Sequence, residues 1–153
     1  IAEATGNGRY AACGRQVQAS LTSTDAEVRR ILAAIPAERR VLVTDHDALG
    51  YFASAYGFRI AGVVVPGGST EAEPSSAELS ALVDTVRSTG VRAIFSNTAV
   101  SPKLVQAVSA DAGAAVAVVP LYVDSVGPAG SDASTYAAMM LHDARAVAAA
   151  LTN

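Results

Sequence analysis

The sequence contains only two histidines, and one of them, His46, stands between Asp45 and Asp47. The surrounding stretch VLVTDHDALGYFASAYGF, residues 41–58, passes from an apolar run through these polar residues into an aromatic helical pattern. An imidazole nitrogen together with carboxylate oxygens can bind zinc, manganese or iron. The same imidazole, oriented by a carboxylate, can act as a general base. Asp45 or Asp47 can instead cap the following helix or accept a hydrogen bond from the imidazole N–H.

Two further polar groups follow apolar segments later in the chain. Asn97 comes directly after residues 93–96, and Asp124 with Ser125 comes shortly after residues 115–119. If these segments are parallel strands, their carboxyl ends lie along one edge of a sheet, where ligands bind. We therefore expect Asp124 near His46, with the other polar residues around them. Two ligands make half of a four-coordinate zinc site, and no other residue clearly supplies the rest.

The pattern of the chain predicts the elements that position these residues. Apolar runs predict strands, and steps of three and four between apolar residues predict helices. Ser75 and Glu78 have the spacing of a capping box, and Ser101-Pro102 has the form of a helix start. The expected strands are residues 40–44, 60–65 (apolar on both faces, as in a buried strand), 93–96 and 115–119; the expected helices cover about 47–56, 75–89, 101–113 and 136–151. This alternation predicts an α/β fold with a four-stranded parallel sheet flanked by helices.

The first 36 residues differ from the rest of the chain. Apolar side chains recur at helical spacing over residues 9–35, so this stretch must pack on a neighbouring surface. Ser23-Thr24-Asp25 could cap a second helix there, which leaves one long helix or two helices open. We therefore divide the chain into a linking helix, residues 1–36, and an α/β lobe, residues 37–153.

Composition excludes several classes of protein. The 153 residues are 51% hydrophobic and 16% charged, which argues for a packed core and against disorder. The net charge is −3 and the basic residues are scattered, so no nucleic-acid partner is expected. The single cysteine, Cys13, excludes a cysteine-rich zinc site, and no apolar run is long enough to cross a membrane. Because the first residue is Ile1, we expect a piece of a longer product, with any signal peptide or lipid anchor outside it.

Other candidate motifs have simpler interpretations. Residues 66–70, PGGST, lack the following Gly-Lys of a phosphate loop and are expected to form a turn, and no G-x-S-x-G motif is present. His142 is expected to be structural or exposed to solvent. Tyr51, Phe52 and Tyr56 are expected to pack in one helical neighbourhood.

Four segments in order resemble one known family. They are VTDHDALGYFASAYGF, GGSTEAEPSSAELSALVD, AIFSNTAVSPK and LYVDSVGPAGSDASTYAAMMLHDARAVAAAL. They are similar to the carboxyl-terminal half of the cluster A-I solute-binding proteins of bacterial metal ABC transporters, and the resemblance covers nearly the whole chain. Residues 9–35 resemble the latter part of the long helix that joins the two lobes of that family. In that family, the segment that matches TDHDAL often has Ser where this chain has Asp45, so this chain carries an additional negative charge at that position.

The resemblance implies a function and a site. In that family the metal lies between two lobes, and the carboxyl-terminal lobe supplies a His or Glu and an Asp, which correspond here to His46 and Asp124. The expected cargo is Zn²⁺, favoured over Mn²⁺ or Fe²⁺, delivered to an ABC permease outside the cytoplasm. The amino-terminal lobe, which normally gives two histidines, is absent from this sequence, so a missing lobe or a second chain must complete the site. An isolated lobe should also expose the apolar surface that meets its partner.

Two other functions remain open from the residues. The chain can be a small α/β enzyme that uses His46 as a general base, although the missing nucleophile and phosphate-binding motifs count against this. It can also be an interaction lobe with a vestigial metal site. The favoured hypothesis is a binding protein and not an enzyme.

Overall fold

The computed structural model describes residues 2–65, 75–98, 103–113 and 116–152, and the strands of this part form one parallel sheet of four. Its order is β2-β1-β3-β4. The strands are β1 (Val41–His46), β2 (Arg59–Val65), β3 (Ala93–Asn97) and β4 (Ala117–Leu121). The helices are α1 (Ala2–Thr5), α2 (Gly8–Leu32), α3 (Gly50–Tyr56), α4 (Ser76–Thr89), α5 (Lys103–Ala112) and α6 (Tyr136–Thr152), with a 3-10 turn η1 (Ala37–Arg39). The predicted α/β fold is confirmed.

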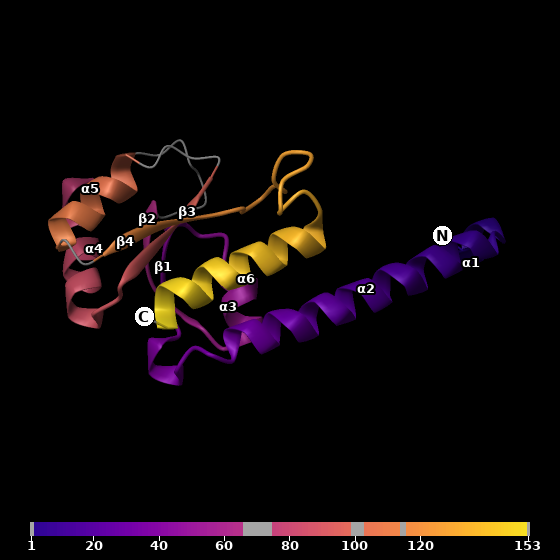
Figure 1. The fold of residues 1–153 in the computed structure, drawn as a ribbon. Coiled ribbons are helices and arrows are strands. Elements are labelled where there is room, and N and C mark those ends of the chain that lie inside the picture. Colours follow the sequence, from indigo (N-terminus) through magenta and orange to yellow (C-terminus); the bar gives the residue numbers. More distant parts are fainter. Residues whose placement is uncertain (1, 66–74, 99–102, 114–115, 153) are drawn as a thin grey trace.

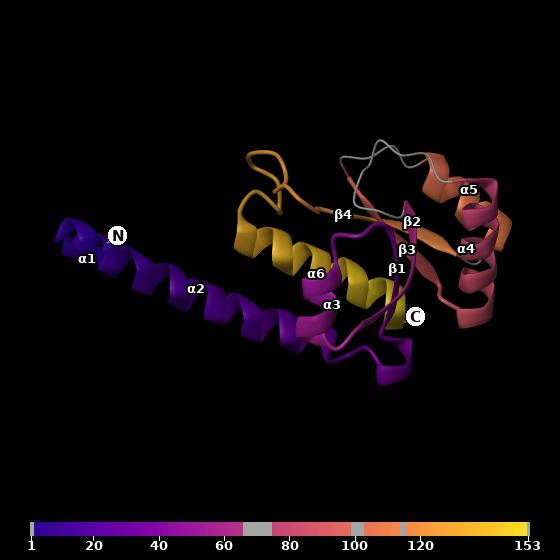
Figure 2. The ribbon, with the colours of Figure 1, turned by 180° about the vertical axis from the view of Figure 1, so that it is seen from behind.

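Helices cover both faces of the sheet, with α4 and α5 on one side and α3, α6 and the end of α2 on the other (Figures 1 and 2). The two faces follow from the alternation of side chains along each strand. Leu42 and Phe95 face one helical layer, whereas Val43 and Ile94 face the other. Each strand residue named here is at most 1% exposed, so the two central strands are buried between two apolar layers.

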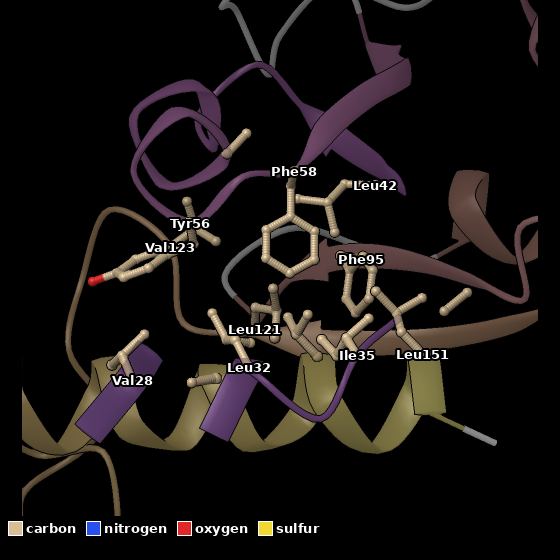
Figure 3. Close-up of a cluster of buried hydrophobic side chains, with 14 residues drawn as sticks. Val28, Leu32, Ile35, Leu42, Tyr56, Phe58, Phe95, Leu121, Val123 and Leu151 are labelled. Atoms are coloured by element: carbon tan, nitrogen blue, oxygen red, sulfur yellow. The ribbon is translucent and has the colours of Figure 1, made fainter. Parts of the chain in front are cut away.

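The larger core lies between the sheet and the layer formed by α2, α3 and α6. Figure 3 shows the ring of Phe58 lying near Phe95, with Leu32 and Leu151 entering from the helices below them. Phe52 adds ring contacts to Tyr56 and Phe58, at centroid distances of 4.8 and 5.7 Å. This core fixes α2, α3 and α6 against the strands.

The long helix α2 resolves the alternative that the sequence left open, because it runs through residues 23–25 without a break. The Thr24 hydroxyl donates to the Ser20 carbonyl within the helix, at 2.9 Å, and so does not act as a cap. The carboxyl-terminal part of α2 packs beside α6, and the other part projects beyond the sheet (Figures 1 and 2). On the projecting part the apolar residues Tyr10, Val17 and Leu21 are 51%, 51% and 45% exposed.

Several predicted boundaries are confirmed. Ser75 and Glu78 form the capping box of α4, since Ser75 Oγ accepts from the Glu78 N–H and Glu78 Oε2 accepts from the Ser75 N–H. Gly57 and Gly90 end α3 and α4 with left-handed backbones, which glycine adopts without strain. The predicted start of α5 at residues 101–102 and the turn at residues 66–70 lie outside the described part of the chain.

Other predictions were wrong in detail. Residues 60–65 were expected to be fully buried, but β2 is an edge strand in which only Val64 is buried. β4 begins at Ala117 and contains Pro120, which an edge strand tolerates because one side of it needs no hydrogen bond. Tyr51 does not pack with its neighbours and is 94% exposed. No helix in the described ranges is both long and apolar enough to cross a membrane.

Candidate metal centre

The candidate centre lies where the order of strand addition reverses along the parallel sheet. From β1 the chain crosses to β2 on one side, then returns to place β3 on the other side of β1. The helices that follow two such strands lie on opposite faces, which opens a crevice at the carboxyl ends of the strands. His46 ends β1 and Asn97 ends β3, so both residues stand at this crevice.

His46 and Asp124 meet at this edge, as the sequence predicts. The His46 Nε2 atom lies 3.0 Å from Asp124 Oδ2, although 78 positions separate the two residues. The His46 side chain is 8% exposed and the Asp124 side chain 68%. The pair therefore joins a buried imidazole to a carboxylate that faces solvent.

Asp45 occupies the other side of the imidazole. Its Oδ1 accepts from the His46 backbone N–H and lies 2.8 Å from His46 Nδ1. Its Oδ2 accepts from the Asn97 backbone N–H at 2.6 Å and from the Ser96 hydroxyl at 3.4 Å. Asp45 is 5% exposed. The carboxylate thus links β1 to β3, and the alternative that it caps α3 is wrong.

Asn97 closes the arrangement. Its side-chain Nδ2 donates to Asp124 Oδ2 at 3.5 Å, and its backbone N–H is the donor to Asp45. Asp45, His46, Asp124 and Asn97 therefore form a closed ring of polar contacts, called the polar ring below, in which both imidazole nitrogens donate only when the imidazole is protonated. It is built from β1, β3 and the segment after β4, so the sheet topology brings its members together.

Asp124 is held in an uncommon backbone conformation. Its φ is +67°, in the left-handed region that side chains rarely adopt, although Asp tolerates it better than most residues. The surrounding segment is fixed by backbone hydrogen bonds from Thr98 to the Leu121 carbonyl, at 2.9 Å, and from Gly127 to the Ala133 carbonyl, at 2.8 Å. Strain of this kind persists only where neighbouring structure imposes it.

Gly127 and Asp143 are two supports that the sequence analysis did not identify. A Cβ on Gly127 would lie 2.6 Å from Ser131 Oγ and 3.1 Å from both Tyr122 and Ala133, so any other residue there requires these side chains to move. Asp143 Oδ1 accepts from the Tyr122 N–H at 3.0 Å and is 8% exposed. The sequence feature that could have identified Asp143 is its place four positions before the buried Val147, which puts a charged residue on the apolar face of α6.

Burial raises the pKa of Asp143 to about 6, and the hydrogen bond from Tyr122 and the charge of His142 oppose this only in part. For His46, burial alone would lower the pKa of the imidazole. The hydrogen bonds and charges of Asp45 and then Asp124 outweigh it, so the pKa lies above the ordinary 6.5. The polar ring therefore favours the protonated, positively charged form of the His46 imidazole.

The spacing of His46 and Asp124 suits a metal cation. Two ligands at about 2.0–2.1 Å from a tetrahedral zinc lie about 3.3 Å apart. The observed 3.0 Å between Nε2 and Oδ2 needs only a slight opening to admit an ion. Among the described residues, no group of three or more His, Cys, Asp or Glu side chains could hold a metal. His46 and Asp124 would therefore supply only part of a coordination shell.

The remaining candidates lie outside the polar ring. Asp47 is exposed and does not cap α3, which begins at Gly50 with Leu49 at its N-cap. The short turn that the Ala48 N–H closes on the His46 carbonyl, at 3.0 Å, delays this helix beyond the predicted position. Ser125 is exposed. His142 instead pairs with Asp132, with Nδ1 and Oδ2 2.9 Å apart, at the surface.

Comparison with known proteins identifies the family. The model of the ZnuA family, zinc-uptake complex component A, periplasmic, matches residues 2–150. The chain belongs to this family of metal ABC transporter solute-binding proteins.

Its relatives differ in the metals that their names state. The chain is 39% identical over 138 residues to the zinc-binding protein TroA of Treponema pallidum, covering 88% of this chain and 44% of TroA. It is 33% identical over 141 residues to the manganese-binding lipoprotein MntA of Bacillus subtilis, covering 90% and 45%. The solved structure of periplasmic zinc-binding TroA superposes with a TM-score of 0.83 at 36% identity, over 91% of this chain and 51% of that one. The chain thus spans about half the length of the relatives it matches.

Proposed function

We propose that this chain is the carboxyl-terminal lobe of an extracytoplasmic receptor that captures a divalent transition metal and delivers it to an ABC permease. The observation that carries the proposal is the placement of His46 Nε2 and Asp124 Oδ2, 3.0 Å apart, at the switch point of the sheet. In this proposal both are metal ligands, and the metal is cargo that is bound and released unchanged. Its relatives are named as zinc-, manganese- and iron-binding proteins, which supports this class of cargo.

Zinc is our preferred cargo over manganese. A given set of nitrogen and oxygen ligands binds zinc more tightly than manganese, and one imidazole with one carboxylate suits a tetrahedral site. The names of the relatives include both metals, so they support either cargo.

The remaining ligands come, in this proposal, from an amino-terminal lobe that precedes the linking helix. We assign residues 1–36 to that helix and residues 37–153 to the carboxyl-terminal lobe. Two exposed apolar surfaces support a partner lobe. One is the projecting part of α2, with Tyr10, Val17 and Leu21; the other is a hollow of about 320 Å³ between α3 and α6 that reaches Asp124 and has Tyr51 and Tyr136 on its lining. A second copy of the chain is the alternative partner.

Calorimetric titration with Zn²⁺ and then Mn²⁺ tests the function, with His46→Ala and Asp124→Ala beside the unchanged chain. We expect zinc binding that each substitution weakens by at least about tenfold, and weaker manganese binding. His142→Ala is the matched control, because it removes the other imidazole, and it should bind zinc as the unchanged chain does. A stoichiometry of one metal per two chains would indicate pairing. Equal affinity in all variants would refute the assignment of the ligands.

A further inference from the structure

Asp45 has contacts that a purely structural carboxylate between two strands does not need. Asn97 and Ser96 already engage Oδ2, which joins β3 to β1. The second oxygen, Oδ1, turns to the His46 imidazole and lies 2.8 Å from Nδ1. One oxygen therefore anchors the carboxylate to the sheet, and the other meets the ring of the proposed ligand.

Asp45 is not placed to bind the metal itself. Its side chain is 6% exposed, and both oxygens are occupied by donors on the protein. Coordination through either oxygen would leave a buried backbone N–H without its partner, which costs about 1–3 kcal/mol. The polar ring also places Asp45 on the Nδ1 side of the imidazole, whereas Asp124 lies on the Nε2 side.

The two carboxylates compete for the single proton of a neutral imidazole. Asp45 is buried and anchored by the backbone N–H groups of His46 and Asn97, whereas the Asp124 side chain is 68% exposed and solvated. A charge-assisted hydrogen bond is stronger away from water, so the tautomer in which Nδ1–H donates to Asp45 should be favoured over the one in which Nε2–H donates to Asp124. The lone pair of the ring is then on Nε2, which faces Asp124 and the crevice.

We propose that Asp45 is a positioning residue, whose carboxylate fixes the His46 ring with the proton on Nδ1 and the lone pair of Nε2 directed at the cargo metal. This inference rests on the proposed metal-binding function. A carboxylate behind an imidazole fixes its orientation and makes it a more basic ligand, and loss of such a partner weakens metal binding by about 10- to 100-fold.

The first test is the position of the proton in the metal-free chain. Long-range ¹H–¹⁵N spectra, recorded as the pH is raised until the His46 ring signals stop changing, distinguish a protonated ring nitrogen from a bare one. We expect a protonated Nδ1 and a bare Nε2 on His46. In Asp45→Asn the population should shift toward the proton on Nε2, because the single amide oxygen cannot serve both His46 and Asn97. A proton on Nε2 in the unchanged chain would overturn the proposal without any variant.

The second test is zinc affinity, measured by competition with a chromophoric chelator. Asp45→Asn should weaken binding by about 10- to 100-fold. The matched control, Asp47→Asn, removes the same charge from the exposed residue that follows His46 in the chain and should change the affinity less than about fivefold. Equal affinities in the two variants, or an unchanged tautomer in Asp45→Asn, would overturn the positioning role. Absence of zinc binding in every chain would refute the proposed function instead, and the tautomer would still decide whether Asp45 positions the ring.

Discussion

The Asp143 carboxylate on α6 accepts a hydrogen bond from the backbone N–H of Tyr122, at 3.0 Å, two residues before Asp124. This contact ties the last helix to the segment that carries the exposed member of the polar ring. It also buries a carboxylate that would be more stable in water, since its pKa is raised to about 6. The contact thus secures the site, whereas the burial of the Asp143 carboxylate costs stability near neutral pH.

This cost predicts that Asp143→Asn stabilises the chain above pH 6. The pKa of Asp143 is raised from 3.8 unfolded to about 6 folded, so its contribution is fully present below pH 4 and is lost as the pH rises through 6. The loss amounts to at most about 3 kcal/mol. Urea denaturation at pH 4 and pH 7.5 measures it. The variant should gain stability only at the higher pH, whereas Asp84→Asn, at an exposed position, should not show this pattern. A gain of the same size at both pH values would contradict the explanation.

The left-handed backbone of Asp124 predicts that two small substitutions there differ in their effect on stability. Asp124→Gly and Asp124→Ala both remove the carboxylate, but only glycine adopts φ +67° freely. The metal-free glycine variant should therefore be more stable than the alanine variant by about 1 kcal/mol. Denaturant midpoints of the two variants measure the difference. Equal midpoints would show that the segment relaxes and stores no strain.

We expect that a substitution at Gly127, which is not a proposed ligand, lowers both the stability of the chain and its affinity for zinc. In Gly127→Ala the added Cβ would meet Ser131 Oγ at 2.6 Å, so side chains in the segment after β4 must move. We expect a loss of about 1–3 kcal/mol in stability and weaker zinc binding. Gly14→Ala, on the projecting part of α2 with no atom near the new Cβ, is the control and should leave zinc affinity unchanged. Zinc binding by Gly127→Ala equal to that of the unchanged chain would show that Asp124 does not depend on this packing.

Zinc binding should weaken as the pH falls. A metal displaces the proton from Nε2, and Asp45 and Asp124 raise the pKa of His46 above 6.5 against the opposing effect of burial. Competition by protons should therefore begin near neutral pH, with about a tenfold loss of affinity per pH unit below the pKa. Titrations between pH 8 and pH 5.5 measure the slope. A flat profile over this range would argue that His46 does not bind the metal.

The sequence predicted much of this arrangement, because strong patterns marked its main elements. Alternating strands and helices implied a parallel sheet, and that fold alone places His46 and Asp124 at one edge. The order of the strands was not predictable from periodicity, yet it puts β1 beside β3 and so brings Asn97 to Asp45. The order also makes β2 an edge strand, which explains why its apolar residues are only partly buried.

The supports of the site were harder to predict than its ligands. Asp143 matters because α6 crosses the end of β4, and Gly127 matters because three side chains converge on it. The contacts of Gly127 have no signature in local spacing, and the spacing that places Asp143 on the apolar face of α6 does not show which backbone N–H it binds. Asp47 and Ser125 resembled site residues by their place in the chain, but the turn after His46 and the backbone of Asp124 leave them exposed.

The central claim is that His46 and Asp124 bind the metal, and anomalous diffraction from crystals of the zinc-loaded chain tests it most directly. We predict a zinc peak within about 2.0–2.2 Å of His46 Nε2 and of an Asp124 carboxylate oxygen. The surface pair His142 and Asp132 is the competing His–carboxylate site in the described part of the chain. A zinc peak at that pair, with none between His46 and Asp124, would contradict the account.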